Sequence, residues 1–426
     1  MSDFAAQVFQ NEYLPAGGEV VDAVVTVTAA EGASAGRPNE MVEVIVIDTS
    51  GSMQGDRGAK IASARDATKV AIDTLRDGVL FAIVAGTELA QVVYPFGQPL
   101  ARADERTRTE AKAAVSRVEA KGGTAIGSWL KAASSLIAAA PGAISHVVLM
   151  TDGKNEHERP HELDEAIAGS VGQFQCDCLG LGTDWIKAEL DKVSSALLGR
   201  TDIVPTPGEM EFQFRALTEK AMGKQTGNVA LRLWTPQGSQ IEFLKQVAPE
   251  LDDLTPKAQT VSPLVRDYPL GAWAGGEDRD YHLQVRVPVG SVGSERLAAR
   301  VMLVVGGVEQ PAALVRALWT DDERLSTRIN REVAHYTGQA ELADAIHDGL
   351  AARDSGDDET ATVKLGRAVQ LAHETGNDET VRLLQKVVDV EDPDAGTVRL
   401  KREVADVDAM TLDVRSTRTV RVNKSQ

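Results

Sequence analysis

Four runs of apolar residues, with little polar alternation, constrain the fold of this chain most strongly. The runs are MVEVIVID (41–48), LFAIVAG (80–86), HVVLMTDG (146–153) and FQCDCLGLG (174–182). Such continuous patterns are typical of parallel strands that are buried on both faces. Helical patterns lie between the runs, at 60–78, 105–123, 126–140 and 162–172. The alternation predicts an α/β fold with an open, doubly wound, mostly parallel sheet.

The rest of the chain shows two other sequence patterns. Short segments rich in β-branched residues follow from about residue 227, and turn signals such as PQG and AGGED separate them, which predicts an antiparallel β-sandwich. The segment EVVDAVVTVTA (19–29) has the same character, so we expect it to join that sandwich, with the α/β domain inserted between. From residue 321 the pattern is helical again, and a three-helix bundle is expected.

These patterns predict five regions along the chain. They are N-terminal strands of the sandwich (1–38), the α/β domain (39–224), the β-sandwich (225–320), a helical bundle (321–392) and a flexible, locally basic tail (393–426). The tail is polar, with Arg415, Arg418, Arg421 and Lys424 against Asp413, and such composition is typical of disordered ends.

Polar residues follow two of the apolar runs. Asp48 ends the first run and is followed by Ser50 and Ser52, and Asp152 comes near the end of the third. In a doubly wound sheet, ligands bind beyond the carboxyl ends of the strands. The turn KGGTAIGSW can bring Thr124 to the same edge. Carboxylate and hydroxyl oxygens, without imidazole or thiolate, favour Mg²⁺ or Mn²⁺, with Ca²⁺ as a further hard cation, over zinc or copper.

Each of these elements has an ordinary structural explanation when taken alone. Asp48, Ser50 and Thr124 are all good helix N-caps or turn residues, and Asp152 with Gly153 is a common turn. The three elements together, each at its place in the strand–helix alternation, are harder to explain by caps and turns. We therefore interpret them as one metal site.

The set D48-T-S-G-S52, G-G-T124 and T151-D152-G resembles the von Willebrand factor type A domain with a complete metal-ion-dependent adhesion site. The resemblance covers roughly residues 40–222. It implies that Ser50, Ser52 and Thr124 approach the metal directly or through water, while Asp48 and Asp152 hold coordinated waters. It also implies an open metal position that a carboxylate from a partner protein fills. The wider arrangement resembles bacterial and inter-alpha-trypsin-inhibitor-like proteins with a type A domain inserted in a β-sandwich.

The main alternative is a Mg²⁺-dependent phosphohydrolase or phosphotransferase that uses Asp48 as nucleophile. Haloacid-dehalogenase-type phosphatases have D-x-D, whereas Ser50 stands at the second position here and cannot protonate a leaving group at neutral pH. The G-x-x-x-x-G-K-[ST] phosphate loop is absent from the sequence. His157 and His161 lie near Asp152, but Pro160 breaks their helical spacing, so they are weak metal candidates. We therefore expect a binding protein and not an enzyme.

Composition limits the classes of partner and the cellular compartment that we expect for this chain. The chain has 45 basic and 63 acidic residues, for a net charge of −18, which disfavours nucleic acid and anionic membranes as partners. The N-terminus does not read as a signal peptide, and no apolar run is long enough for a transmembrane helix. The only cysteines, Cys176 and Cys178, are two apart on a predicted strand and should both face the core. We expect a cytoplasmic protein.

The resemblance and the tail suggest specific partners. Many intracellular bacterial type A proteins are partners of AAA+ ATPases or of kinase-linked signalling modules, and this chain resembles them. Thr411, Thr417 and Thr419 each have Val three residues later, a spacing that resembles the phosphothreonine motifs read by forkhead-associated domains. A serine/threonine kinase and a forkhead-associated domain protein are therefore candidate partners through the tail. The alternative is a basic tail that contains these residues by chance.

Overall fold

The computed structural model describes residues 4–31 and 40–422, which form two compact units. One unit is Gly36–Gly227 with Gly271–Ala274, and the other is Met1–Ala35, Asn228–Leu270 and Gly275–Gln426. The predicted boundary between 38 and 39 lies outside the described residues, and the other predicted boundaries stay predictions. In the described residues, no helix is both long and apolar enough to cross a membrane.

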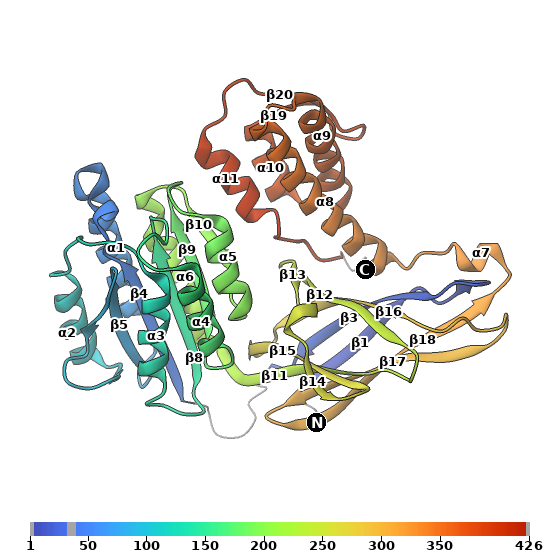
Figure 1. The fold of residues 1–426 in the computed structure, drawn as a ribbon, viewed down its shortest axis with the longest axis horizontal. Coiled ribbons are helices and arrows are strands. Elements are labelled where there is room, and N and C mark those ends of the chain that lie inside the picture. The colour runs from blue at the N-terminus through green and yellow to red at the C-terminus, as the bar shows by residue number, and fades with distance from the viewer. Residues whose placement is uncertain (1–3, 32–39, 423–426) are drawn as a thin grey trace. The chain divides into compact units, whose positions relative to one another are not determined.

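A seven-stranded sheet forms the centre of the first unit (Figure 1). Its strands are β4 (Met41–Asp48), β5 (Leu80–Gly86), β6 (Ala90–Tyr94), β7 (Ala101–Arg102), β8 (Ile144–Thr151), β9 (Gln175–Leu181) and β10 (Thr201–Val204). The order is β10-β9-β8-β4-β5-β6, with β7 also on β5. The five strands from β10 to β5 in this order are parallel, whereas β6 and β7 are antiparallel to β5. Because β5 and β8 lie on opposite sides of β4, the connection reverses between β4 and β8.

Helices cover both faces of this sheet, as expected for doubly wound topology (Figure 1). They are α1 (Gly55–Thr74), α2 (Glu105–Val115), α3 (Ile126–Ile137), α4 (Pro160–Ser170), α5 (Lys187–Ala196) and α6 (Met210–Met222), with single turns η1 (Gly51–Gln54) and η2 (Pro207–Glu209). Helices α1, α2 and α6 share one apolar core with alternate residues of the central strands, including Ile45 and Ile47. On the other face α4 packs against α3 and α5.

The second unit contains most of two mostly antiparallel sheets, whose residues 224–227 and 271–274 belong to the first unit. Their strands are β1 (Phe4–Gln10), β2 (Leu14–Pro15), β3 (Val20–Ala29), β11 (Lys224–Trp234), β12 (Gln240–Ala248), β13 (Asp252–Asp253), β14 (Gln259–Ser262), β15 (Val265–Ala274), β16 (Asp278–Arg286), β17 (Glu295–Val305) and β18 (Val308–Thr320), with the turn η3 (Thr255–Lys257). The sheet orders are β1-β3-β16-β12-β13 and β14-β15-β11-β17-β18-β2. Strand β16 pairs along its whole length with β3, from Asp278↔Thr28 to Arg286↔Val20. The predicted insertion of the α/β fold into the sandwich is confirmed.

Helices follow the sandwich in the same unit. They are α7 (Glu323–Ser326), α8 (Arg331–Asp354), α9 (Asp358–Thr375), α10 (Asp378–Val387) and α11 (Asp406–Arg415), with a hairpin of β19 (Val388–Asp392) and β20 (Thr397–Leu400). Side chains of Asn330, Asp357 and Asn377 cap the starts of α8, α9 and α10 by accepting backbone N–H groups. Gly376 ends α9 at φ +69°. The predicted helical bundle is therefore present.

The predicted flexible tail is wrong for residues 393–422. Strand β20 and helix α11 lie within it, and Leu412 packs into the core of the helices. Beyond α11 the chain is held by backbone hydrogen bonds, from Leu251 N to Thr417 O at 2.8 Å and from Thr419 N to Pro249 O at 3.1 Å. The composition misled the prediction, because a few apolar side chains and tertiary backbone bonds suffice to order this segment. Residues 423–426, with Lys424, lie outside the described residues.

The prediction that Thr411, Thr417 and Thr419 lie in a mobile, accessible segment is also wrong. Thr411 is 4 % exposed within α11, and its hydroxyl donates to Val407 O at 2.6 Å. The Thr419 hydroxyl donates to Val247 O at 2.6 Å, and Thr417 is only partly exposed. A phosphate adds about two charges, which the buried site of Thr411 cannot solvate while α11 is folded.

Candidate metal site

The carboxylates of Asp48 and Asp152 lie at the same edge of the seven-stranded sheet. Asp48 is the last residue of β4, and Asp152 directly follows β8. The two strands are parallel neighbours, paired from Met41↔Ile144 to Ile47↔Met150, so their carboxyl ends meet at the point where the connection reverses. Both aspartates are 0 % exposed. Burial of two carboxylates together is costly unless hydrogen bonds or a cation compensate.

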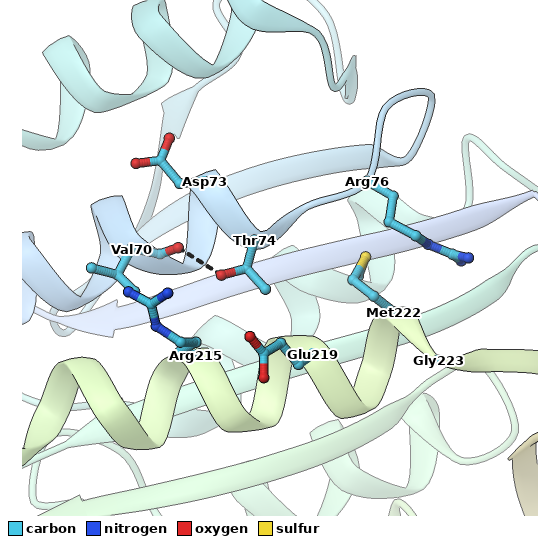
Figure 2. Close-up of a pocket in the computed structure, with 8 residues that line it drawn as sticks. All are labelled: Val70, Asp73, Thr74, Arg76, Arg215, Glu219, Met222 and Gly223. Carbon is cyan, nitrogen blue, oxygen red and sulfur yellow. Dashed lines mark hydrogen bonds between the residues drawn. The ribbon is translucent and has the colours of Figure 1, made fainter.

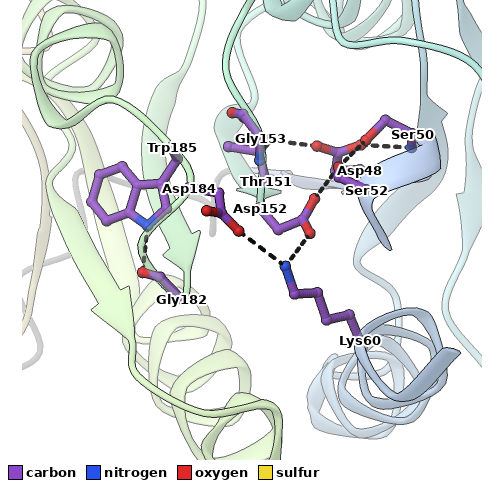
Figure 3. Close-up of polar contacts among 10 residues, drawn as sticks. All are labelled: Asp48, Ser50, Ser52, Lys60, Thr151, Asp152, Gly153, Gly182, Asp184 and Trp185. Atoms are coloured by element: carbon purple, nitrogen blue, oxygen red, sulfur yellow. Dashed lines mark hydrogen bonds and ion pairs between the residues drawn. The ribbon is translucent and has the colours of Figure 1, made fainter. Parts of the chain in front are cut away.

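The loop after β4 links the two aspartates through hydroxyl groups (Figure 3). Ser50 N donates to Asp48 Oδ1 at 2.7 Å, and the hydroxyl oxygens of Ser50 and Ser52 are 2.9 Å apart. Ser52 Oγ donates to Asp152 Oδ1 at 2.6 Å. Ser50 is buried, whereas Ser52 is exposed. Four of the five predicted site residues therefore form one connected polar cluster.

The fifth residue, Thr124, reaches the same place from the loop before α3. Gly122 in this loop has φ +82°, and its carbonyl accepts Gly51 N at 2.9 Å, which ties the loop to the one after β4. A Cβ atom built on Gly153 would lie 3.3 Å from Ser52 Oγ and 3.5 Å from Thr124 Oγ1. The hydroxyls of Ser52 and Thr124 thus both face Gly153, beside Asp152.

The Thr124 loop is held by Glu88, which the sequence did not single out, and by His157, which the sequence indicated only as a weak metal candidate. His157 Nδ1 accepts Thr124 N at 3.2 Å, and His157 N donates to Thr124 O at 3.0 Å. Glu88 Oε2 accepts Gly123 N at 2.6 Å, and this bond lowers the pKa of Glu88. His157 therefore positions Thr124, a predicted ligand, by forming hydrogen bonds with the backbone of Thr124. The other histidine near Asp152, His161, is exposed on α4.

Thr151 and Lys60 were not predicted as site residues, and both contact the aspartates. Thr151 Oγ1 donates to Asp48 Oδ2 at 2.5 Å, and Lys60 Nζ lies 2.7 Å from Asp152 Oδ2. Burial raises the pKa of Asp48 to about 6, against the hydrogen bonds from Thr151 and Ser50, and the nearby charge of Asp152 acts in the same direction as burial. The TDG signature contained Thr151 already. For Lys60 the only sequence signal was its place early in the helix that follows Asp48.

The donor set fits a hard divalent cation. It consists of two carboxylates and three hydroxyls, all oxygen, which suit Mg²⁺ or Mn²⁺ better than softer metals. Within residues 4–31 and 40–422, no three His, Cys, Asp or Glu side chains are grouped so as to hold a metal ion. A metal at this edge would therefore depend on the serine and threonine hydroxyls as well as on the carboxylates.

Other polar features of this unit lie outside the cluster. A groove of about 540 Å³ runs along α1 and α6 and contains both acidic and basic side chains (Figure 2). The residues lining it are Val70, Asp73, Thr74, Arg76, Arg215, Glu219, Met222 and Gly223. Cys176 and Cys178 are buried free thiols with sulfur atoms 4.0 Å apart, as expected for core-facing cysteines.

Comparisons with known proteins place this chain in a family. Residues 43–203 match the von Willebrand factor type A domain, and residues 370–416 match the von Willebrand factor type A C-terminal domain. The structure is similar to that of a von Willebrand factor type A protein from Catenulispora acidiphila, with 51 % sequence identity and a TM-score of 0.92 over 99 % of this chain and 97 % of the other.

A more distant structural similarity agrees on the fold. The ArnB paralog VWA2 from Sulfolobus acidocaldarius shares 15 % identity, with a TM-score of 0.60 over 98 % of each chain. The uncharacterized protein sll0103 from Synechocystis is 28 % identical over 229 residues, and the chain spans about half the length of that relative. Similarity to the Catenulispora protein over nearly the full length of both chains, together with the domain match, shows that this chain belongs to the von Willebrand factor type A family.

Proposed function

We propose that this protein is a metal-dependent adaptor whose Asp48–Asp152 cluster holds a Mg²⁺ ion that binds a carboxylate of a partner protein. Type A domains commonly bind a divalent metal and generally mediate metal-dependent protein–protein interaction. The observation that carries the proposal is the convergence of Asp48, Ser50, Ser52 and Asp152 in one connected cluster, with the Thr124 hydroxyl beside it. In this proposal the adhesion site is complete, and Mn²⁺ or Ca²⁺ are alternative ions.

The residues of the cluster would divide the work. Ser50, Ser52 and Thr124 offer neutral oxygens to the ion, while Asp48 and Asp152 hold its waters and balance its charge. Neutral ligands leave the ion electrophilic, so that it can take a partner's Asp or Glu. Thr151 and the Ser50 amide keep the Asp48 carboxylate oriented by donating to its two oxygens.

The setting of this adaptor is part of the proposal. We infer an intracellular role in bacterial signalling or in partnership with an AAA+ ATPase, in the cytoplasm, on the family resemblance and the acidic composition. Binding to a kinase and a forkhead-associated protein through the C-terminal threonines is not included, because Thr411 is buried and the Thr419 hydroxyl is already bonded.

Type A domain proteins are generally non-enzymatic adaptors, and the local chemistry at Asp48 agrees with that role. A phosphohydrolase that used Asp48 as nucleophile would need a free carboxylate oxygen and a nearby acid. Both oxygens of Asp48 accept hydrogen bonds, from Ser50 N and Thr151 Oγ1. Two residues after Asp48, Ser50 carries a hydroxyl group, which cannot act as that acid at neutral pH. The adaptor is therefore the function that the site supports best.

Calorimetric titration of the full chain with MgCl₂ or MnCl₂ tests the metal proposal. We expect saturable binding of one ion per chain, and Asp48→Asn should weaken it by about 10–100-fold, the range seen when groups that support a metal site are changed. Asp66→Asn, on the exposed side of α1, is the matched control and should bind like the wild type. Equal binding by wild type and Asp48→Asn would contradict the proposal.

A further inference from the structure

Lys60 is a half-buried cation placed directly against the proposed metal site (Figure 3). It lies in the second turn of α1, its side chain is 14 % exposed, and its ammonium is 2.7 Å from Asp152 Oδ2. The other carboxylate oxygen, Asp152 Oδ1, accepts from Ser52. Asp152 therefore has one oxygen toward the hydroxyl cluster and one toward Lys60, so an ion among the hydroxyls and the Lys60 ammonium can contact the same carboxylate at once.

A second acidic residue stands near Lys60 but is of a different kind. Asp184 Oδ2 is 3.6 Å from the ammonium, and the Asp184 side chain is 76 % exposed, so water screens its charge. The loop that carries it is fixed, because Trp185 packs against Gly180 and donates to Gly182 O at 2.9 Å. The strong partner of Lys60 is thus the fully buried Asp152, inside the cluster.

The charges of Asp48, Asp152 and Lys60 define what the metal-loaded site can attract. Asp48 and Asp152 contribute two negative charges when ionised, and Lys60 contributes one positive charge. A divalent ion added to this set leaves a net charge of about +1, whereas the same set without Lys60 would be neutral. In a partly dry site, a net positive charge favours an incoming anion more strongly than a set of charges that sums to zero.

We propose that Lys60 selects for a carboxylate partner by keeping the metal-loaded site cationic, through its ion pair with Asp152. This inference rests on the proposed function, since it assumes the ion at the cluster. It assigns Lys60 as a positioning and specificity residue, which acts on the ion and its ligand through Asp152. The partner chemistry it favours is an exposed Asp or Glu side chain, and a neutral oxygen donor such as an amide would gain nothing from Lys60.

The proposal makes two predictions of opposite sign for the same substitution. Lys60 repels the ion, so Lys60→Gln should bind Mn²⁺ more tightly than the wild type, by about three- to tenfold. Lys60 also attracts the anion, so acetate should bind the Mn²⁺-loaded variant at least about threefold more weakly. A residue with only a structural role would not move these two affinities in opposite directions.

Manganese provides the measurement for both affinities in the full chain. Free Mn²⁺ is followed by electron paramagnetic resonance, and acetate is then titrated at constant ionic strength while water proton relaxation reports displacement of bound water. Lys60→Arg keeps the charge and should behave like the wild type. Lys69→Gln removes a lysine of the same helix that pairs with exposed Asp66, and it controls for a general change in charge. Far-ultraviolet circular dichroism checks that each variant is folded.

The outcomes separate this inference from the function it rests on. Tighter Mn²⁺ binding with weaker acetate binding in Lys60→Gln, but not in Lys69→Gln or Lys60→Arg, supports the role of Lys60. Unchanged or weaker Mn²⁺ binding by Lys60→Gln, or unchanged acetate binding, overturns that role alone. If the wild type binds no Mn²⁺ at all, the proposed metal site fails, and the inference fails with it.

Discussion

His146 lies between two buried carboxylates at the end of the sheet opposite to the aspartate cluster. Its Nδ1 is 2.9 Å from Glu43 Oε1, and its Nε2 is 3.3 Å from Asp177 Oδ2, across strands β4, β8 and β9. Burial alone would lower the pKa of His146, but the two carboxylates outweigh it and raise the pKa to about 10. The positive charge of the protonated imidazole compensates the cost of burying Glu43 and Asp177.

This cluster predicts how stability depends on pH. The folded pKa of His146 lies above its unfolded value of 6.5, so its contribution to the free energy of unfolding is full below about pH 6.5 and falls as pH rises toward 10. His146→Gln should therefore lose more stability at pH 6 than at pH 9, by about 2–3 kcal/mol. Chemical denaturation at both pH values measures this. Exposed His373→Gln is the control, and an equal loss at both pH values for His146→Gln would contradict the assignment.

The sequence predicted the five residues of the candidate site but not their supports, for a physical reason. Asp48, Ser50 and Ser52 stand next to one another in the chain, and their order is the signal. Asp48 and Thr151 are 103 positions apart, and only the pairing of β4 with β8 brings them together. Lys60 and Asp152 are 92 positions apart, and a lysine on a helix usually faces solvent. Contacts of this kind depend on the register of packed elements, which local patterns do not encode.

At the scale of elements, two glycines in the C-terminal helices illustrate opposite packing. A Cβ atom on Gly366 of α9 would come within 2.3 Å of Gly396 O in the β19–β20 hairpin. A Cβ atom on Gly338 of α8 would meet nothing closer than Thr375 Cγ2, at 3.9 Å. The first glycine allows the hairpin to approach α9, whereas the second has no packing role of that kind.

Alanine substitutions at these glycines should therefore change stability in opposite directions. Gly366→Ala pushes the hairpin from α9 and should lower the free energy of unfolding by about 1–3 kcal/mol. Gly338→Ala should raise it by about 0.5–1 kcal/mol, because alanine restricts the unfolded chain and favours the helix. Urea denaturation of both variants compares them directly. A stabilised Gly366→Ala protein would show that the hairpin does not pack closely on α9.

The continuous apolar strands and the amphipathic helices could be predicted from the sequence, because the spacing of apolar residues and the length of each run are local properties of the chain. The insertion of the α/β fold could be predicted too, since β3 is rich in β-branched residues like the strands that it joins. The structure of the end of the chain could not be predicted. Helix α11 contains Asp406, Asp408 and Arg415 and looks polar, but Leu412 and Val414 are buried. The backbone after the helix forms hydrogen bonds with residues 249–251. The tertiary partner, and not the composition, orders that segment.

At the scale of the whole molecule, the chain has two compact units with separate cores, and the proposed ion belongs to one of them. An ion that binds the folded state stabilises it by RT ln(1 + [L]/Kd), about 2.7 kcal/mol at a concentration 100 times Kd. The stabilised part should be the unit that contains the seven-stranded sheet. The stability of the helices in the other unit should not change when the metal binds.

Hydrogen exchange measured by mass spectrometry tests this division. With saturating Mg²⁺, we expect slower exchange in the loops around 48–53, 121–125 and 151–154, where the candidate ligands and their supporting bonds lie. Peptides from 331–415 should exchange at the same rate with Mg²⁺ and with EDTA. Calcium-free and magnesium-free wild type is the reference, and Asp48→Asn should show no protection. Uniform protection over both units would contradict a local metal site.

The most direct measurement of the central claim is an anomalous diffraction map from a crystal of the protein grown with MnCl₂. The proposal predicts one strong manganese peak at the carboxyl ends of β4 and β8, bounded by the hydroxyl oxygens of Ser50, Ser52 and Thr124, with Asp48 and Asp152 behind it. A peak only elsewhere, or none in crystals soaked at saturating Mn²⁺, would contradict the metal site and the adaptor function built on it.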